Sequence, residues 1–131
     1  MRGRVCTKVV AVAAVAGVIA TMATLPPAKA DALDGIHRFC VGLWGTDMVM
    51  LERCRNGQIE AMEQLVAWLE KHDVNARAKA VTKLDDDPYV AIYSTCSDRW
   101  LGDGPDSGTA DYKMTARCIQ KQVEAYNRMA Q

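Results

Sequence analysis

Residues 40–62 read CVGLWGTDMVMLERCRNGQIEAM, and residues 96–126 read CSDRWLGDGPDSGTADYKMTARCIQKQVEAY. Both stretches contain Cys, Trp, Asp, Met, Cys and Gln in the same order, and the second has eight additional residues between its Trp and its Asp. A shared order of rare residue types indicates one supersecondary unit that is used twice. The matching residues are Ile36, Cys40, Trp44, Asp47, Met50, Arg53, Cys54, Gln58, Glu60 and Ala61 in the first copy, and Ile92, Cys96, Trp100, Asp111, Met114, Arg117, Cys118, Gln122, Glu124 and Ala125 in the second.

Each copy predicts two helices joined by a turn. In the first copy, Gly45 ends the first helix, and Thr46 or Asp47 caps the second. Apolar residues recur at helical spacing on both sides of this turn, which predicts two buried faces. These faces comprise Ile36, Cys40, Leu43 and Trp44 before the turn, and Met50, Cys54, Ala61, Leu65, Trp68 and Leu69 after it.

The second copy and the connection between the copies also carry helix-start residues. Asp87 is a predicted N-cap with Pro88 in the first helical position, and Asp31 holds the equivalent place in the first copy. Asp73 is the predicted cap of a linking helix over residues 73–85, with Val74, Ala78, Val81 and Leu84 as its apolar stripe.

The predicted fold class is therefore all-α. No stretch shows the sustained period-two alternation of a strand. We predict one small bundle of two disulfide-stapled helical hairpins, residues 31–72 and 86–131, joined by the linking helix. The eight additional residues lie in LGDGPDSGTA at residues 101–110, which has the composition of a loop.

This geometry predicts how the cysteines pair in disulfides. Cys40 precedes the first turn by about five residues and Cys54 follows it by about eight, so the two lie at similar heights on facing helices. The same argument joins Cys96 to Cys118. In the chain-entropy model, each disulfide stabilises the fold by about 3 kcal/mol because it closes a loop of this size. A small domain needs such stabilisation because its hydrophobic core is small.

Residues 1–30 have the pattern of a cleaved export signal. A basic start is followed by the uncharged run VVAVAAVAGVIATMATL at residues 9–25 and by AKA at residues 28–30. Signal peptidases accept such a small-x-small sequence, so we predict cleavage after Ala30. An uncleaved membrane anchor is the alternative, but it needs about 20 apolar residues.

The predicted mature chain, residues 31–131, is mildly acidic. It keeps all sixteen acidic residues but only twelve of the sixteen basic ones, which gives a net charge of −4. Its basic residues are also scattered along the sequence. We therefore predict no nucleic-acid partner, no preference for an anionic membrane surface and no stable membrane insertion after cleavage.

Several repeated residues allow a structural and a functional interpretation. Trp44 and Trp100 are expected to cover the disulfides, with ligand stacking as the alternative. Gln58 and Gln122 are expected to tie helices together by hydrogen bonds. The methionines Met48, Met50, Met62, Met114 and Met129 are expected to fill the core, with copper(I) ligation as the alternative.

Acidic residues cluster in two places. Asp98, Asp103, Asp106 and Asp111 surround the long loop but lack the spacing of an EF-hand, so a solvated loop is preferred to a calcium site. The run of residues 85–87 precedes a helix and is explained by capping. Because loops that exceed structural need often carry function, we expect Asp103 and Asp106 to belong to a partner-binding surface.

No motif for catalysis or for a cofactor is present, so we predict a non-enzymatic protein without a cofactor or a metal. The chain contains no Gly-x-Ser-x-Gly and no His-Glu-x-x-His sequence. The preferred function is an exported binding, adaptor or inhibitor protein, periplasmic or secreted, with a protein partner. A small envelope hydrolase, with His37 or His72 beside a carboxylate, is the alternative. A copper carrier is a more remote one.

The pattern Cys-x3-Trp followed by Asp-x2-Met-x3-Cys-x3-Gln-x-Glu-Ala resembles helical-hairpin segments of small, uncharacterised exported bacterial proteins. The resemblance covers most of residues 31–131 in two copies. It implies export, disulfides and helices, and it implies no activity and no functional residues.

Export should remove residues 1–30, so the exported form should begin at Asp31 and lack Cys6. The intact mass of the exported protein measures this directly. A retained N-terminus in the membrane fraction would contradict the prediction.

Overall fold

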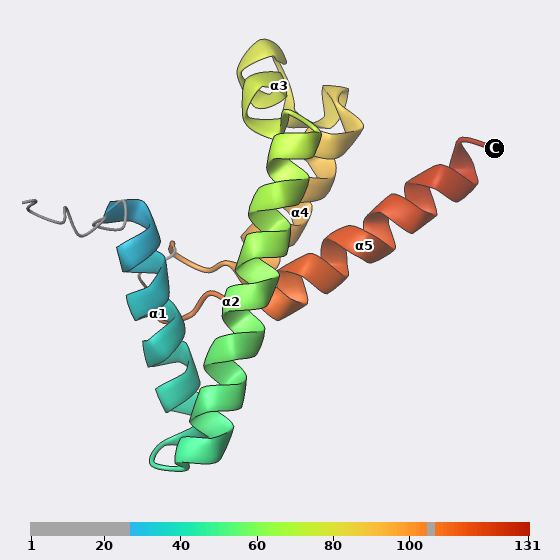
Figure 1. Ribbon diagram of the computed structural model, residues 1–131. Coiled ribbons are helices and arrows are strands. Elements are labelled where there is room, and N and C mark those ends of the chain that lie inside the picture. Colours follow the sequence, from blue (N-terminus) through green and yellow to red (C-terminus); the bar gives the residue numbers. More distant parts are fainter. Residues whose placement is uncertain (1–26, 105–106) are drawn as a thin grey trace, which may run out of the picture.

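The computed structural model describes residues 27–104 and 107–131, and this part of the chain is helical without strands. The helices are α1 (Pro27–Trp44), α2 (Met48–Lys71), α3 (Val74–Ala80), the 3-10 helix η1 (Leu84–Asp86), α4 (Pro88–Trp100) and α5 (Tyr112–Met129). Helices α1 and α2 form the first hairpin, α4 and α5 form the second, and α3 links them (Figure 1). The predicted all-α bundle is confirmed.

The two hairpins meet along α2 and α5. Helix α2 contacts α1, α3 and α5, and α4 packs mainly on α5. Figure 1 shows α5 starting beside the middle of α2 and diverging from it toward the C-terminus. The core lies where these helices converge, and its buried members include Ala32, Ile36, Cys40, Leu51, Ala61, Met62, Leu65, Ile92, Cys96, Ala110, Tyr112 and Ile119.

Both predicted disulfides are present. Cys40 is bonded to Cys54 and Cys96 to Cys118, and each pair has its Cα atoms 5.7 Å apart. Cys40 and Cys96 are fully buried. Each bond therefore joins the two helices of one hairpin. The sequence separations of 14 and 22 differ by the eight additional residues of the second copy, which lie in its loop.

The helix starts of the two copies are alike. Gly45 ends the first helix at φ +55°, a left-handed conformation that favours glycine. A carboxylate oxygen of Asp47 accepts a hydrogen bond from the N–H of Met50, and Asp111 accepts one from Met114. The predicted N-cap Asp47 is thus present, and its repeat counterpart Asp111 caps α5 in the same way.

Asp87 caps α4 as predicted, with Pro88 in the first turn. Its Oδ1 accepts hydrogen bonds from the N–H groups of Tyr89 and Val90, and its Oδ2 lies 3.1 Å from a guanidinium nitrogen of Arg77. This ion pair joins α3 to the start of α4.

Two predicted helix boundaries differ from the structure. Helix α1 begins at Pro27, so Asp31 lies inside it and is not an N-cap. The linking helix ends at Ala80, and Asp73 has a left-handed φ of +49° without a side-chain capping bond. Val74 is the only buried residue of α3, and Leu84 is half exposed, so little tertiary packing supports a longer helix.

The prediction that Leu43 and Trp44 lie on the buried face is wrong. Their exposed fractions are 59% and 41%. Both side chains line an open hollow that faces Met114 and Arg117 of the second hairpin, so they are not covered by a neighbouring helix. Trp44 therefore does not fill the core, whereas its counterpart Trp100 is partly buried.

Gln58 provides the predicted tie between helices. It is 3% exposed, and its Nε2 donates to Oδ1 of Asp111 at 3.0 Å. Its Oε1 accepts hydrogen bonds from the N–H groups of Tyr112 at 2.7 Å and Lys113 at 3.3 Å. One side chain of α2 thus satisfies two of the free N–H groups at the start of α5.

Gln122 does not repeat this role. It is exposed on α5. The prediction of a structural tie is therefore confirmed for Gln58 and wrong for Gln122. The two glutamines differ because Gln58 lies on the face of α2 that packs against the start of α5, whereas Gln122 lies on an exposed face of α5.

Replacing Gln58 with Ala should lower the free energy of unfolding by about 1–3 kcal/mol, because buried backbone donors lose their acceptor. The repeat supplies a matched control, Gln122→Ala, which should change stability by less than about 0.5 kcal/mol. Urea unfolding followed by circular dichroism measures both. Equal effects of the two substitutions would contradict the assigned role of Gln58.

Candidate functional site

The main concave feature is a groove between α2 and α5. Gln58 holds the start of α5 against α2, and the two helices then diverge. The groove between them has a volume of about 620 Å³, which is within the range of ligand sites. It is lined from one side by Gly57, Glu60, Ala61, Gln64, Leu65 and Trp68, and from the other by Lys113, Ala116, Arg117, Ile119, Gln120, Val123 and Glu124.

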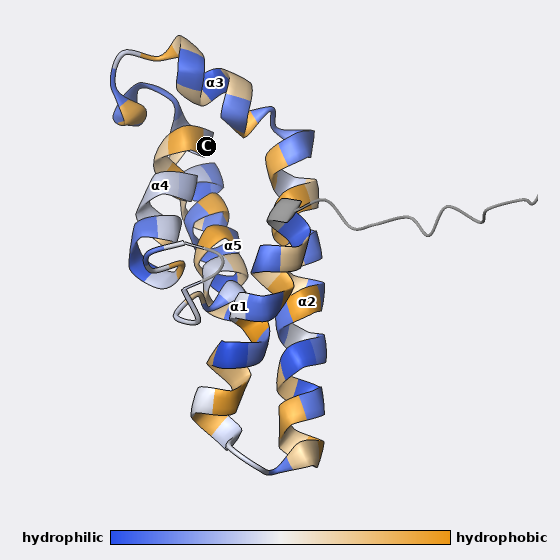
Figure 2. Ribbon diagram, turned by 90° about the vertical axis from the view of Figure 1, so that its left-hand side faces the viewer, coloured by the Kyte–Doolittle hydropathy of each residue, from blue (hydrophilic) through white to orange (hydrophobic). Residues whose placement is uncertain are grey.

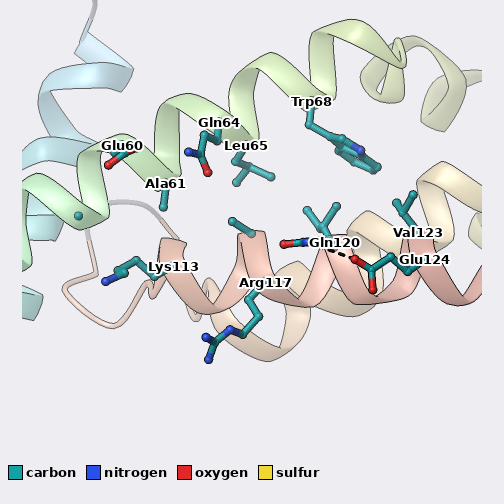
Figure 3. A pocket seen from close by; sticks show the side chains of 13 residues that line it. Glu60, Ala61, Gln64, Leu65, Trp68, Lys113, Arg117, Gln120, Val123 and Glu124 are labelled. Atoms are coloured by element: carbon teal, nitrogen blue, oxygen red, sulfur yellow. Dashed lines mark hydrogen bonds between the residues drawn. The ribbon is translucent and has the colours of Figure 1, made fainter.

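The floor of the groove is apolar. Leu65 and Ile119 are buried, and Trp68 and Val123 are partly buried. Figure 3 shows Leu65 and Trp68 pointing from α2 toward α5, with Val123 pointing back from the facing helix. Small side chains such as Ala116 leave space along this floor, so it presents apolar surface to an incoming chain.

The rim of the groove carries charges of both signs. Glu60 lies on α2, and Lys113 and Glu124 lie on α5. Gln120 donates a hydrogen bond from Nε2 to Oε1 of Glu124 at 3.1 Å. A rim of mixed charge suits a polypeptide with its own mixed charges better than a polyanion.

A second hollow, of about 470 Å³, lies on the side of the turn between α1 and α2. Its apolar lining includes Leu43 and Trp44, and its cations are Arg53, Lys113 and Arg117. Lys113 and Arg117 border both hollows, and Figure 3 shows Arg117 pointing away from α2.

The methionines of the copper alternative are distributed unevenly. The repeat partners Met50 and Met114 both line the second hollow. Met62 is buried in the core, whereas Met48 and Met129 are largely exposed. The described residues contain no group of three or more His, Cys, Asp or Glu side chains that could hold a metal ion.

The predicted partner-binding loop is partly seated on α1. Asp103 is exposed, and Asp106 lies outside the described residues. Ala110 is 2% exposed, and Gly108 has a φ of +75° close to the side chain of Arg38. The end of the loop is therefore part of the fold, contrary to the expectation that all eight additional residues exceed structural need.

The two histidines lie apart. His37 is exposed on α1, and His72 stacks on Tyr89 with ring centroids 4.3 Å apart. The guanidinium of Arg77 lies over the ring of Tyr89, 5.1 Å from its centroid. Within the described part of the chain, no hydrogen bond or ion pair joins either histidine to a carboxylate. His72 therefore packs at the junction of α2, α3 and α4.

Three side chains have shifted pKa values, and none of them lines the groove. Desolvation alone raises the pKa of Asp87, but hydrogen bonds from Val90 and Tyr89 and the guanidinium of Arg77 outweigh it, and the net pKa is lowered. Burial raises the pKa of Tyr93. Burial, together with the nearby Tyr93, raises that of Tyr112. Capping and core packing account for these shifts.

Comparisons with family models, curated proteins and solved structures found no match to this chain. None of the described helices combines the length and the apolar character that a membrane crossing requires.

Sequence reasoning did not identify the α2–α5 groove. Its lining residues are ordinary helix-face residues, spread over residues 57–68 and 113–124. A groove arises from the angle between two helices, and no residue pattern encodes that angle directly. The one available indication was Gln58, a polar residue on the buried stripe.

A Gly108→Ala substitution tests the seating of the loop. A Cβ there would lie 3.1 Å from Cβ of Arg38 at a positive φ, so we expect a loss of about 1–3 kcal/mol. The control is Gly42→Ala, which has open space on a helix and should be neutral or stabilising by up to about 1 kcal/mol. Thermal unfolding measures both, and unchanged stability of Gly108→Ala would show that the loop is not held against α1.

Proposed function

We propose that this protein is an exported, non-catalytic binding protein whose α2–α5 groove takes an amphipathic helix of a protein partner. The observation that carries the proposal is the apolar floor of an open groove between two diverging helices. A third helix laid into such a groove completes a three-helix contact, which is a common mode of peptide recognition. The partner belongs to the cell envelope or the extracellular space.

The chemistry of the groove supports a helical partner. Trp68 and Val123, which are partly buried above Leu65 and Ile119, offer apolar surface for residues at i, i+3, i+4 and i+7 of the incoming helix. Glu60 and Lys113 on the rim offer charges that fix its direction. Such a surface suits an adaptor or an inhibitor of a secreted enzyme.

Export is supported by two observations. The two disulfides, Cys40–Cys54 and Cys96–Cys118, favour an oxidising compartment. Residues 1–30 have the pattern of an export signal. Both are compatible with the periplasm and with secretion.

The long loop remains a proposed second contact for the same partner. Asp103 is exposed after α4, so it is accessible to a bound protein. Because the end of the loop packs on α1, this contact is tested by Asp103→Asn with Asp106→Asn and not by shortening the loop.

Site-specific crosslinking tests the proposed groove. A photoreactive phenylalanine at Gln64, on the groove rim, should crosslink one defined envelope or secreted protein through a helical segment that mass spectrometry identifies. The same probe at Val66, which is 46% exposed on another face of α2, is the control and should not.

The variant Ala116→Phe fills the groove and should abolish the crosslink from Gln64. Its melting temperature should stay close to that of the parent because Ala116 borders the open groove and the larger ring has space there. A crosslink that persists in Ala116→Phe, or one that forms equally well from Val66, would contradict the proposal. If the crosslink is lost in the Asp103→Asn, Asp106→Asn variant but persists in Ala116→Phe, the partner binds the loop and not the groove.

A further inference from the structure

Apolar side chains are concentrated at the turn between α1 and α2. Of the eight large apolar side chains that are exposed in the described residues, five lie within residues 41–49. The turn forms one end of the molecule, at the bottom of Figures 1 and 2. Its exposed members are Val41, Leu43, Trp44, Met48 and Val49, with exposed fractions of 39%, 59%, 41%, 70% and 60%.

Folding does not require this apolar turn. In the second hairpin, the counterpart of Met48 is Tyr112, which is 5% exposed, and the counterpart of Val49 is the cation Lys113. Exposed apolar groups that gather in one place indicate an interaction surface, because single exposed apolar residues are ordinary but patches are not. We define residues 41–49 as the apolar turn.

Three cations lie beside the apolar turn. Arg53, Lys113 and Arg117 line the same hollow as Leu43 and Trp44. Over residues 27–104 and 107–131, ion pairs join only Asp34 to Arg38 and Arg77 to Asp87, so these three cations are unpaired there.

Among the described residues, one acidic side chain lines this hollow. Asp111 has an Oδ1 that already accepts hydrogen bonds from Gln58 and Met114. The hollow therefore offers positive charge to an anion from outside the chain. The combination of an apolar turn with unpaired cations defines the chemistry of its partner.

We propose that the apolar turn docks on the surface of an anionic phospholipid bilayer. This differs from the expectation that scattered basic residues give no preference for such a surface, because the fold gathers Arg53, Lys113 and Arg117 beside the turn. Leu43, Met48 and Val49 enter the boundary of the acyl chains, and the indole of Trp44 lies at the level of the headgroups. Arg53, Lys113 and Arg117 then donate hydrogen bonds to lipid phosphate oxygens.

The dimensions agree with this placement. Arg53 follows Met48 by five residues, which is about 7.5 Å along α2. An interfacial apolar segment enters the headgroup and acyl boundary to a depth of about 5–10 Å. With the turn inserted, Arg53 therefore reaches the level of the phosphates.

The shape of the surface favours a bilayer over a protein groove. Met48 and Val49 are strongly exposed at the end of the hairpin and do not line the hollow, and a deformable bilayer accepts such a projecting end without a preformed cavity. The charge of the predicted mature chain, −4, also disfavours contact of other faces with anionic lipid. The turn is thus the preferred point of attachment.

Vesicle sedimentation tests the proposal. The protein should bind vesicles of equimolar phosphatidylglycerol and phosphatidylcholine and should bind pure phosphatidylcholine much more weakly. Met48→Ser combined with Val49→Ser should weaken binding about tenfold or more. Arg53→Gln should weaken it about fivefold and reduce its dependence on salt.

Matched controls lie at the other end of α2. Lys71→Gln removes the same charge 18 residues after Arg53, about 27 Å away along the helix and beyond the screening length. Val66→Ser removes an exposed apolar side chain far from the turn. Both should leave vesicle binding within twofold, and circular dichroism and melting temperature should match the parent for every variant.

Three results would overturn the proposal. They are equal binding to both vesicle compositions or to neither, displacement by millimolar inorganic phosphate alone, and a dimer in analytical ultracentrifugation that the Met48→Ser, Val49→Ser variant dissociates. The first result would exclude anionic lipid as the ligand. The second would indicate that the ligand is a soluble anion, and the third that the apolar turn binds a second copy of the chain. All variants leave Lys113, Arg117 and the α2–α5 groove intact, so failure here is independent of the proposed helix-binding function.

Discussion

The amide of Gln58 determines where the two hairpins meet, and the other surface features depend on that position. Its two oxygen contacts and one nitrogen contact fix the start of α5 against the middle of α2. A buried amide must find partners for both its donor and its acceptor, so the pairing specifies one register. From this point α5 diverges from α2, which opens the groove on one side and leaves the turn between α1 and α2 uncovered on the other.

The disulfides stabilise each hairpin internally, whereas Gln58 joins one hairpin to the other. Each of them fixes the geometry inside one hairpin, Cys40 to Cys54 and Cys96 to Cys118, and neither crosses between the hairpins. The arrangement of the hairpins relative to each other depends on noncovalent contacts: the Gln58 amide, the α2–α5 core, the seating of the loop on α1 and the stacking of His72 on Tyr89. Reduction and loss of Gln58 should therefore disturb different parts of the structure.

The internal repeat makes two copies with different surroundings. Gln58 is buried while Gln122 is exposed, and Met48 is exposed while its counterpart Tyr112 is buried. Because α2 contacts α1, α3 and α5, whereas α5 contacts α2 and α4, equivalent residues in the two copies meet different neighbours. The two proposed surfaces both arise from this asymmetry: the groove where α5 leaves α2, and the apolar turn that the second hairpin does not cover.

The sequence by itself determined the local structure of this protein. Helical spacing, the caps Asp47 and Asp87, the left-handed Gly45 and the cysteine heights each depend on residues close in the chain, and each was predicted correctly. Local patterns did not determine the burial of Leu43 and Trp44, the length of α3 or the role of Gln122, because these depend on which helix covers which face. Tertiary structure also brought Arg53, Lys113 and Arg117, which are scattered in the sequence, to one hollow. Both candidate surfaces follow from the angle and register of α2 and α5, and those are set by packing between distant segments and not by any local pattern.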